Sequence, residues 1–108
     1  MKKANRAPSG LSAESKRFWT SVVSEYDIGD SAGRRLLLCA CESLDLLRRA
    51  EAVVAADGMT TRDRYGALRA HPMLGVARDA RGAMLTALKH LNLDIEPLRA
   101  GPGRPGGR

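Results

Sequence analysis

The sequence predicts a mainly α-helical fold: a core of about three helices around a long-helix hairpin, with a short loop or β-hairpin near residues 59–70. The two longest periodic segments repeat their apolar residues near every 3.6 positions, which is the period of an amphipathic helix. Leu, Ala and Arg are abundant, whereas strong strand formers are few. Because the chain has 108 residues, it is expected to form one domain with a modest core.

The first helix is predicted over residues 12–26. Ser12 is a favourable N-cap because its hydroxyl can accept a hydrogen bond from a free backbone N–H. Glu14 complements the positive end of the helix dipole. The pattern breaks at residues 27–29. The side chains that share the apolar face of this segment are Leu11, Trp19, Val22, Val23 and Tyr26.

The second helix is predicted to begin at a cap on Asp30 or Ser31 and to continue to about Asp57, a length of about 40 Å at 1.5 Å per residue. Asp45 and Arg49 are expected to form a favourable i,i+4 pair. Two shorter neighbours cannot cover so long a helix, so we expect part of its apolar surface to contact another copy of the chain. The residues assigned to this contact are Leu36, Leu44, Leu47 and Val54. Flanking apolar residues are Cys39, Leu46, Ala50 and Val53.

The third helix is predicted from about Met73 to Leu91. Pro72 suits its first turn, because the missing proline N–H would have no partner there. His71 is therefore expected to be a capping or turn residue.

The segment at residues 59–70 is rich in Thr, Arg and Gly and is expected to turn near residues 63–66. Its basic side chains surround Tyr65 and form a candidate set for contacting nucleic-acid phosphates. The alternative is a solvated loop face with Asp63 as the counter-ion. The basic residues of this candidate set are Arg62, Arg64 and Arg69.

The formal charge of +6 lies in two tails. Residues 1–11 and residues 97–108 each contain three basic side chains and no acid, and the 12 basic side chains between them balance 12 acidic ones. We predict a flexible N-terminal arm at residues 1–11, a helical domain at 12–98 and a flexible tail at 99–108. A flexible basic arm attracts phosphate without a fixed shape, and a solubilising tail is the alternative. The candidate DNA contacts in the tails are Lys2, Lys3, Arg6, Arg104 and Arg108.

Patterns of catalytic or cofactor chemistry are not apparent. Cys39 and Cys41 would lie about 200° apart around a helix, so they are expected to be reduced small core residues rather than a metal pair. His71 and His90 fall at opposite ends of one predicted helix. Residues 101–106 match G-x-G-x-x-G, but two prolines remove backbone donors and no strand precedes them.

No G-x-x-x-x-G-K-[ST] motif occurs, and no apolar run approaches the roughly 20 residues that span a bilayer. The sequence therefore predicts a cytoplasmic protein that is not an enzyme and uses no cofactor, metal or membrane.

The order of several short motifs resembles that of the small terminase subunits of tailed bacteriophages, over residues 11–98. His71 and Asn92 stand where that family usually has asparagine and glycine. Asn92 can end a helix as glycine would, because asparagine tolerates the left-handed backbone region. The elements in order are Trp19, Gly58, Tyr65-Gly66, His71-Pro72, Leu91-Asn92-Leu93 and Pro97.

The resemblance implies a non-catalytic protein that binds double-stranded phage DNA to initiate genome packaging in the cytoplasm of the bacterial host. It also implies a homo-oligomeric ring and a large terminase subunit, whose ATPase and nuclease activities the protein regulates. The alternative is a small helical DNA-binding transcription or nucleoid regulator. Against it, the second predicted helix begins with only Arg34 and Arg35 as residues that could read bases.

Overall fold

Three helices and one two-stranded sheet make up residues 6–93, the part of the chain that the computed structural model describes. The predicted mainly helical fold with a short β-hairpin is thereby confirmed. The elements in chain order are α1 (Ala13–Tyr26), α2 (Ser31–Asp57), β1 (Thr60–Arg62), β2 (Leu68–Ala70) and α3 (Pro72–His90).

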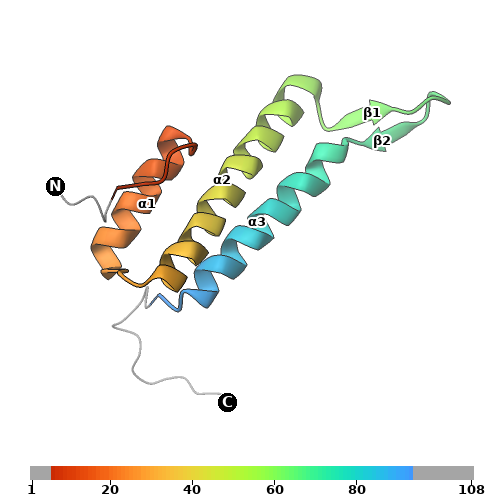
Figure 1. Cartoon of the computed structure of the whole chain (residues 1–108). Coiled ribbons are helices and arrows are strands. Elements are labelled where there is room, and N and C mark those ends of the chain that lie inside the picture. Colours follow the sequence, from red (N-terminus) through yellow and green to blue (C-terminus); the bar gives the residue numbers. More distant parts are fainter. Residues whose placement is uncertain (1–5, 94–108) are drawn as a thin grey trace, which may run out of the picture.

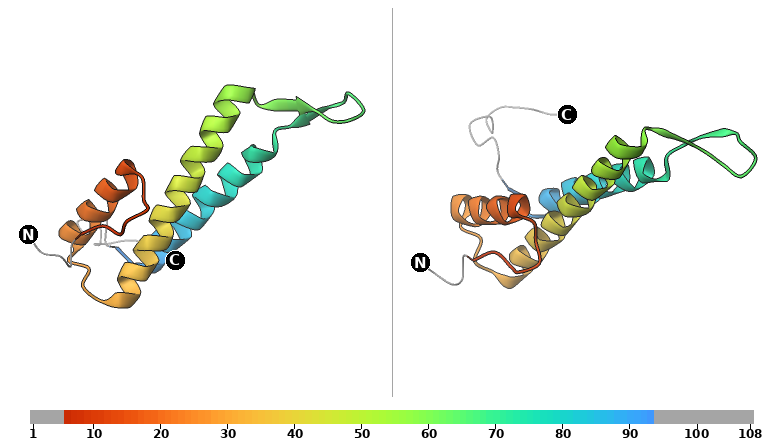
Figure 2. Two further views of the ribbon diagram at one scale, coloured as in Figure 1. Left: turned by 45° about the horizontal axis from the view of Figure 1, so that its top comes forward. Right: turned by 90° about the horizontal axis from the view of Figure 1, so that it is seen from above.

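The body of the molecule is a hairpin of the two long helices (Figure 1). Helices α2 and α3 lie side by side along their length, and α1 packs against the first half of α2. The antiparallel strands β1 and β2 project beyond the opposite end of the helical hairpin, where neither α1 nor α3 covers them (Figure 2). The molecule therefore has a packed helical base and an extended β-hairpin end.

The predicted caps are found at the helix starts. Ser12 Oγ accepts a hydrogen bond from the N–H of Ser15 at 3.1 Å, and Asp30 Oδ2 accepts one from the N–H of Gly33 at 2.8 Å. A Cβ atom at position 33 would lie 2.9 Å from Asp30 Oδ1, so a larger residue there would require the capping side chain to shift. Asn92 has a φ of 58° just after α3, which confirms the predicted left-handed residue.

The first core joins α1 to the start of α2 and to the segment after α3. Leu37 and Cys41 have no exposed surface, and Leu91 and Leu93 pack against this cluster. Burial raises the pKa of the Cys41 thiol to about 12. The two cysteines face different ways, as predicted, but Cys39 is exposed, so the prediction that both are core residues is wrong for Cys39. The buried members of this core are Trp19, Val22, Val23, Ile28, Leu37 and Cys41.

A polar contact also fastens α1 to the middle of α2. The Asp45 carboxylate accepts hydrogen bonds from the Ser12 N–H at 2.9 Å, the Ser12 hydroxyl at 2.6 Å and the buried Ser15 hydroxyl at 2.5 Å. Burial raises the pKa of Asp45, but the hydrogen bonds from the two serines and the positive charge of Arg49 outweigh it, so the pKa lies below its usual value. The predicted i,i+4 pair of Asp45 and Arg49 is therefore electrostatically favourable, although the hydrogen bonds of the carboxylate come from the two serines.

The second core lies between α2 and α3 and corrects one prediction. Leu44 and Leu47 are 7% and 3% exposed because α3 of the same chain covers them. These two leucines are therefore not available to another subunit in this conformation, whereas Leu36 and Val54 remain half-buried. The small Ala77 and Ala80 side chains of α3 pack into this core.

Charged side chains connect all three helices along one side. Arg48 lies 3.1 Å from Glu14 of α1 and 2.9 Å from Glu51, and Glu51 lies 3.2 Å from Arg81 of α3. Because these side chains are about half exposed, each pair adds little stability, but the network occupies two of the basic residues of the body. No helix among the described residues is long and apolar enough to cross a membrane.

Candidate nucleic-acid interface

The β-hairpin is the most exposed structured part of the described chain. Its strands pair Thr60 with Ala70, Thr61 with Arg69 and Arg62 with Leu68, and all but one of these six residues are exposed. An isolated two-stranded hairpin is marginally stable in water, so its turn and its root must hold it in place.

Asp63 organises the turn. Its Oδ1 accepts hydrogen bonds from the N–H groups of Tyr65 at 2.8 Å and Ala67 at 3.0 Å, and its Oδ2 accepts one from Arg69 Nε at 3.0 Å. The bond from Arg69 and those from the two backbone N–H groups hold the pKa of Asp63 below its usual value. Gly66 has a φ of 82°, a conformation that favours glycine, so the predicted turn near residues 63–66 is confirmed.

The three hairpin arginines do not form one surface. Directly paired residues of an antiparallel sheet point to the same face and the face alternates along a strand, so Arg62 and Arg69 lie on opposite faces. Arg69 is held by Asp63, as the counter-ion alternative predicted. Arg62 donates a hydrogen bond to the Gly66 carbonyl at 2.7 Å.

Arg64 and Tyr65 form the tip of the hairpin. The Arg64 guanidinium carbon lies 5.7 Å from the centre of the Tyr65 ring, and the tyrosine is 83% exposed. A cationic group beside an exposed aromatic ring can contact both a phosphate and a base or sugar. The tip therefore has the chemistry of a nucleic-acid contact.

His71 connects the root of the hairpin to both long helices. Its Nδ1 accepts the N–H of Met73 at 3.0 Å, which confirms its predicted capping role, and its backbone N–H donates to the Met59 carbonyl at 2.8 Å. Because Nδ1 is an acceptor, the neutral ring carries its proton on Nε2, which lies 2.9 Å from the Asp57 carboxylate. This buried side chain thus fixes the direction in which the hairpin projects.

A second basic surface, on the outer side of α1, was not identified from the sequence. Lys16 and Arg17 are exposed there, with the hydroxyls of Thr20 and Ser21 one turn further along. Lysine, arginine and hydroxyl side chains are common phosphate contacts. The signal that could have identified this surface was the alternation of these polar residues with the buried stripe of the same helix.

Of the tail residues predicted to bind DNA, Arg6 is described and exposed. Lys2, Lys3, Arg104 and Arg108 lie outside the described residues, as do residues 1–5 of the predicted N-terminal arm and the whole predicted tail at 99–108. In the described part of the N-terminal arm, Ala7 and Leu11 pack against the first core. The start of α2 offers little for reading bases, because Arg34 Nε donates to the Ile28 carbonyl at 3.1 Å.

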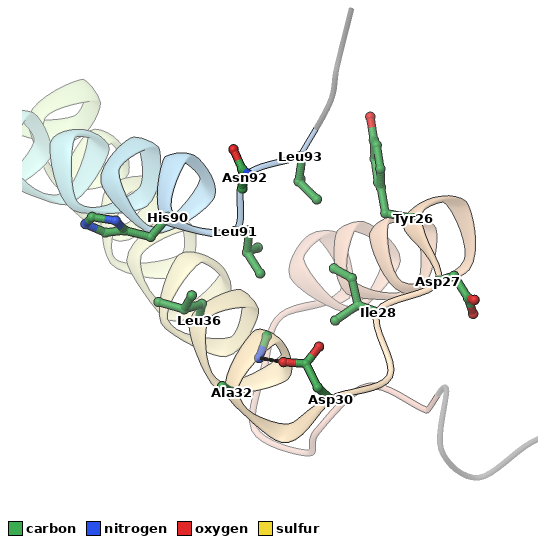
Figure 3. A pocket seen from close by; sticks show the side chains of 11 residues that line it. Tyr26, Asp27, Ile28, Asp30, Ala32, Leu36, His90, Leu91, Asn92 and Leu93 are labelled. Carbon is green, nitrogen blue, oxygen red and sulfur yellow. Dashed lines mark hydrogen bonds between the residues drawn. The ribbon is translucent and has the colours of Figure 1, made fainter. Parts of the chain in front are cut away.

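A hollow of about 380 Å³ lies at the base of the molecule, between the α1–α2 turn and the end of α3 (Figure 3). The apolar part of its lining includes Ile28, Leu36, Leu91 and Leu93. Asp30 also lines it, but its carboxylate already accepts the N–H of Gly33 as the N-cap of α2. Its lining also includes the polar side chains of Asp27, His90 and Asn92, so the hollow is mixed in character. No group of three or more His, Cys, Asp or Glu side chains within residues 6–93 could hold a metal ion.

One comparison with known proteins identifies a family. A family model described as phage terminase, small subunit, matches residues 15–97, which is most of the chain and contains all five structural elements except the first two residues of α1. No curated protein and no solved structure matches the chain.

Proposed function

Because the chain belongs to the phage terminase small-subunit family, we propose that it binds double-stranded viral DNA to initiate genome packaging. In this proposal it is a non-catalytic subunit that regulates the ATPase and nuclease of a large terminase subunit in the host cytoplasm. It would act as a homo-oligomer, with the subunits arranged in a ring.

The observation that carries the DNA-binding part of the proposal is the projecting hairpin. The hairpin extends well away from the helical body (Figures 1 and 2). Its turn carries Arg64 beside the exposed ring of Tyr65. Arg62 lies one strand position before the turn and contributes a second positive charge. In a ring, several copies of such a tip would contact successive phosphates of one duplex.

The basic tails would add contacts that need no fixed shape. We propose that basic side chains at both ends of the chain bind phosphate. These are Lys2, Lys3 and Arg6 at the N-terminal end and Arg104 and Arg108 at the C-terminal end. The outer side of α1, with Lys16 and Arg17, is a further candidate. These contacts would explain how a nearly neutral body binds a polyanion.

Salt-dependent DNA binding tests these assignments. Each phosphate contact contributes about 0.9 to the slope of log affinity against log salt, so replacing both Arg62 and Arg64 with alanine should flatten the slope by up to about 1.8 per engaged subunit. Arg35→Ala is the matched control, because this exposed arginine lies at the opposite end of α2. Deletion of residues 101–108 should flatten the slope by a similar amount, since it removes Arg104 and Arg108.

If the slope is unchanged in the hairpin variant but flatter in the deletion variant, the tails and not the hairpin bind DNA. The reverse result would make the tails solubilising segments or contacts of the large subunit. No binding of duplex DNA by the full chain would contradict the proposed function itself.

Partner assays test the regulatory part. The purified protein should hydrolyse no ATP, and it should change the ATPase or nuclease rate of the large subunit encoded beside it. Light scattering should give a mass well above that of a dimer if a ring forms. Half-buried Leu36 and Val54 remain the candidates from the original set for its subunit contacts.

A further inference from the structure

One row of exposed side chains along α2 is not used by either core. Cys39, Leu46 and Val53 are spaced seven residues apart, which places them on one side of a helix. Leu46 is 40% exposed, Val53 is 41% exposed, and Cys39 is also exposed. α1 and α3 cover the other sides of α2, so this row faces outward.

Two opposite charges lie between these apolar residues. Glu42 and Arg49 fall on the same side of the helix and are both exposed. Within residues 6–93 neither forms a hydrogen bond or a close ion pair, although the charge of Arg49 also helps to lower the pKa of Asp45. We call the five residues the outer row: Cys39, Glu42, Leu46, Arg49 and Val53.

The outer row is complementary to itself when it is reversed. Cys39 and Val53 lie seven residues on either side of Leu46, while Glu42 lies four residues before it and Arg49 three residues after it. Turning a second α2 to run in the opposite direction would therefore place Glu42 of one copy beside Arg49 of the other, at both ends of the contact. The same operation places Leu46 beside its own copy and Cys39 beside Val53.

We infer that the outer row is an interface at which α2 of one copy pairs with the antiparallel α2 of a second copy. A two-fold contact buries the same patch on both subunits, and such a patch must be complementary to itself, as this row is. DNA is a poor occupant because the row carries one acid for each base. The interface is distinct from the predicted Leu36, Leu44, Leu47 and Val54 contact.

This pairing goes beyond the proposed function and does not depend on it. A two-fold contact closes after two copies, whereas a ring needs a different surface that repeats around an axis. Antiparallel pairing would supply dimers, and any larger assembly would use a second contact. A contact along one helix is smaller than a standard interface of about 800 Å² per partner, so the full chain should be measured up to high micromolar concentration.

Charge reversal tests the pairing by sedimentation equilibrium. Glu42→Arg alone creates two arginine–arginine contacts per dimer and should weaken self-association about tenfold. Arg49→Glu alone should have the same effect. The double variant, with both reversals, should restore self-association because opposite charges face each other again. Self-association that is equal in all four proteins, or weakest in the double variant, would overturn the inference.

Cysteine cross-linking tests the direction of the two helices. Leu46→Cys in a Cys39→Ser background should form a disulfide-linked dimer under mild oxidation, since position 46 meets its own copy. The natural Cys39 is the control, because its two copies would lie about 21 Å apart in the antiparallel arrangement and should stay unlinked. Cys41 is buried in the first core and should not react.

Linkage through Cys39 in the natural sequence would indicate parallel helices and overturn the inference. Absence of the Leu46→Cys dimer would overturn it as well, whether or not DNA binding is retained. If the charge variants lose affinity for the large subunit but keep their self-association, the outer row contacts that partner instead. Circular dichroism should show that all variants keep the helical fold, because each replaced side chain is exposed.

Discussion

The two ends of this molecule are stabilised by different interactions. At the base, α1 and the start of α2 bury Trp19, Leu37 and Cys41 in an apolar core, and even the hydroxyl of Ser15 is enclosed. At the other end, the β-hairpin leaves the side chains of Tyr65 and Leu68 exposed. The hairpin keeps its shape through local hydrogen bonds, chiefly those of its turn.

The comparison shows how one short chain separates the part that carries its stability from the part that we propose binds DNA. The apolar cores fix the three helices, so the helical part of the molecule carries most of the stability. Because the hairpin adds little buried surface, its tip residues can change with little effect on folding. This arrangement agrees with a binding tip held on a rigid support, and it predicts that variants at the two ends will have very different effects.

The largest difference should come from leucines at the two ends. Leu37→Ala removes a fully buried side chain and should lower the free energy of unfolding by about 2–5 kcal/mol. Leu68→Ala removes a side chain that is 60% exposed and should change it by less than about 0.5 kcal/mol. Urea denaturation followed by circular dichroism measures both values. Comparable losses in the two variants would show that the hairpin is part of the folding core.

A smaller effect is expected at Asp45, which joins α1 to α2. Asp45→Asn should cost about 1–2 kcal/mol at neutral pH, because the hydrogen bonds of Ser12 and Ser15 lose their charged acceptor. Since the folded pKa lies below the usual value of 3.8, the stabilisation is complete above that value and is lost as the pH falls through the folded pKa. The difference between variant and natural protein should therefore shrink below pH 3.8.

Urea denaturation over a pH series measures this convergence. Asp79→Asn is the matched control for loss of one negative charge, because its side chain is 81% exposed. A difference that stays constant down to the lowest pH would mean that the charge of Asp45 does not contribute.

The sequence was sufficient to predict features that depend on neighbouring residues. The conformational preferences of single residue types predicted the N-caps at Ser12 and Asp30, the turn at Asp63 and the left-handed Asn92. The structure contains all four features. Such signals act within one turn of the chain. For this reason the number and bounds of the helices could be predicted.

Contacts between distant segments could not be predicted in the same way. The sequence predicted that Asp45 interacts with Arg49, four residues away, but it did not predict the hydrogen bonds of Asp45 with Ser12, which is 33 residues away. Leu44 and Leu47 were assigned to another subunit because periodicity shows that a face is apolar without showing what covers it. The opposite faces of Arg62 and Arg69 likewise depend on the register of two strands.

Asp63→Ala should have the smallest effect on global stability. It also tests whether the hairpin unfolds separately from the helices. This change removes the acceptor of the Tyr65 and Ala67 N–H groups and the partner of Arg69. Hydrogen exchange at those two amides should accelerate about fivefold, which corresponds to the loss of one ordinary hydrogen bond. The melting temperature should not change, because the base does not contact the turn. Accelerated exchange throughout α2 and α3 would show instead that the hairpin and the helices unfold as one unit.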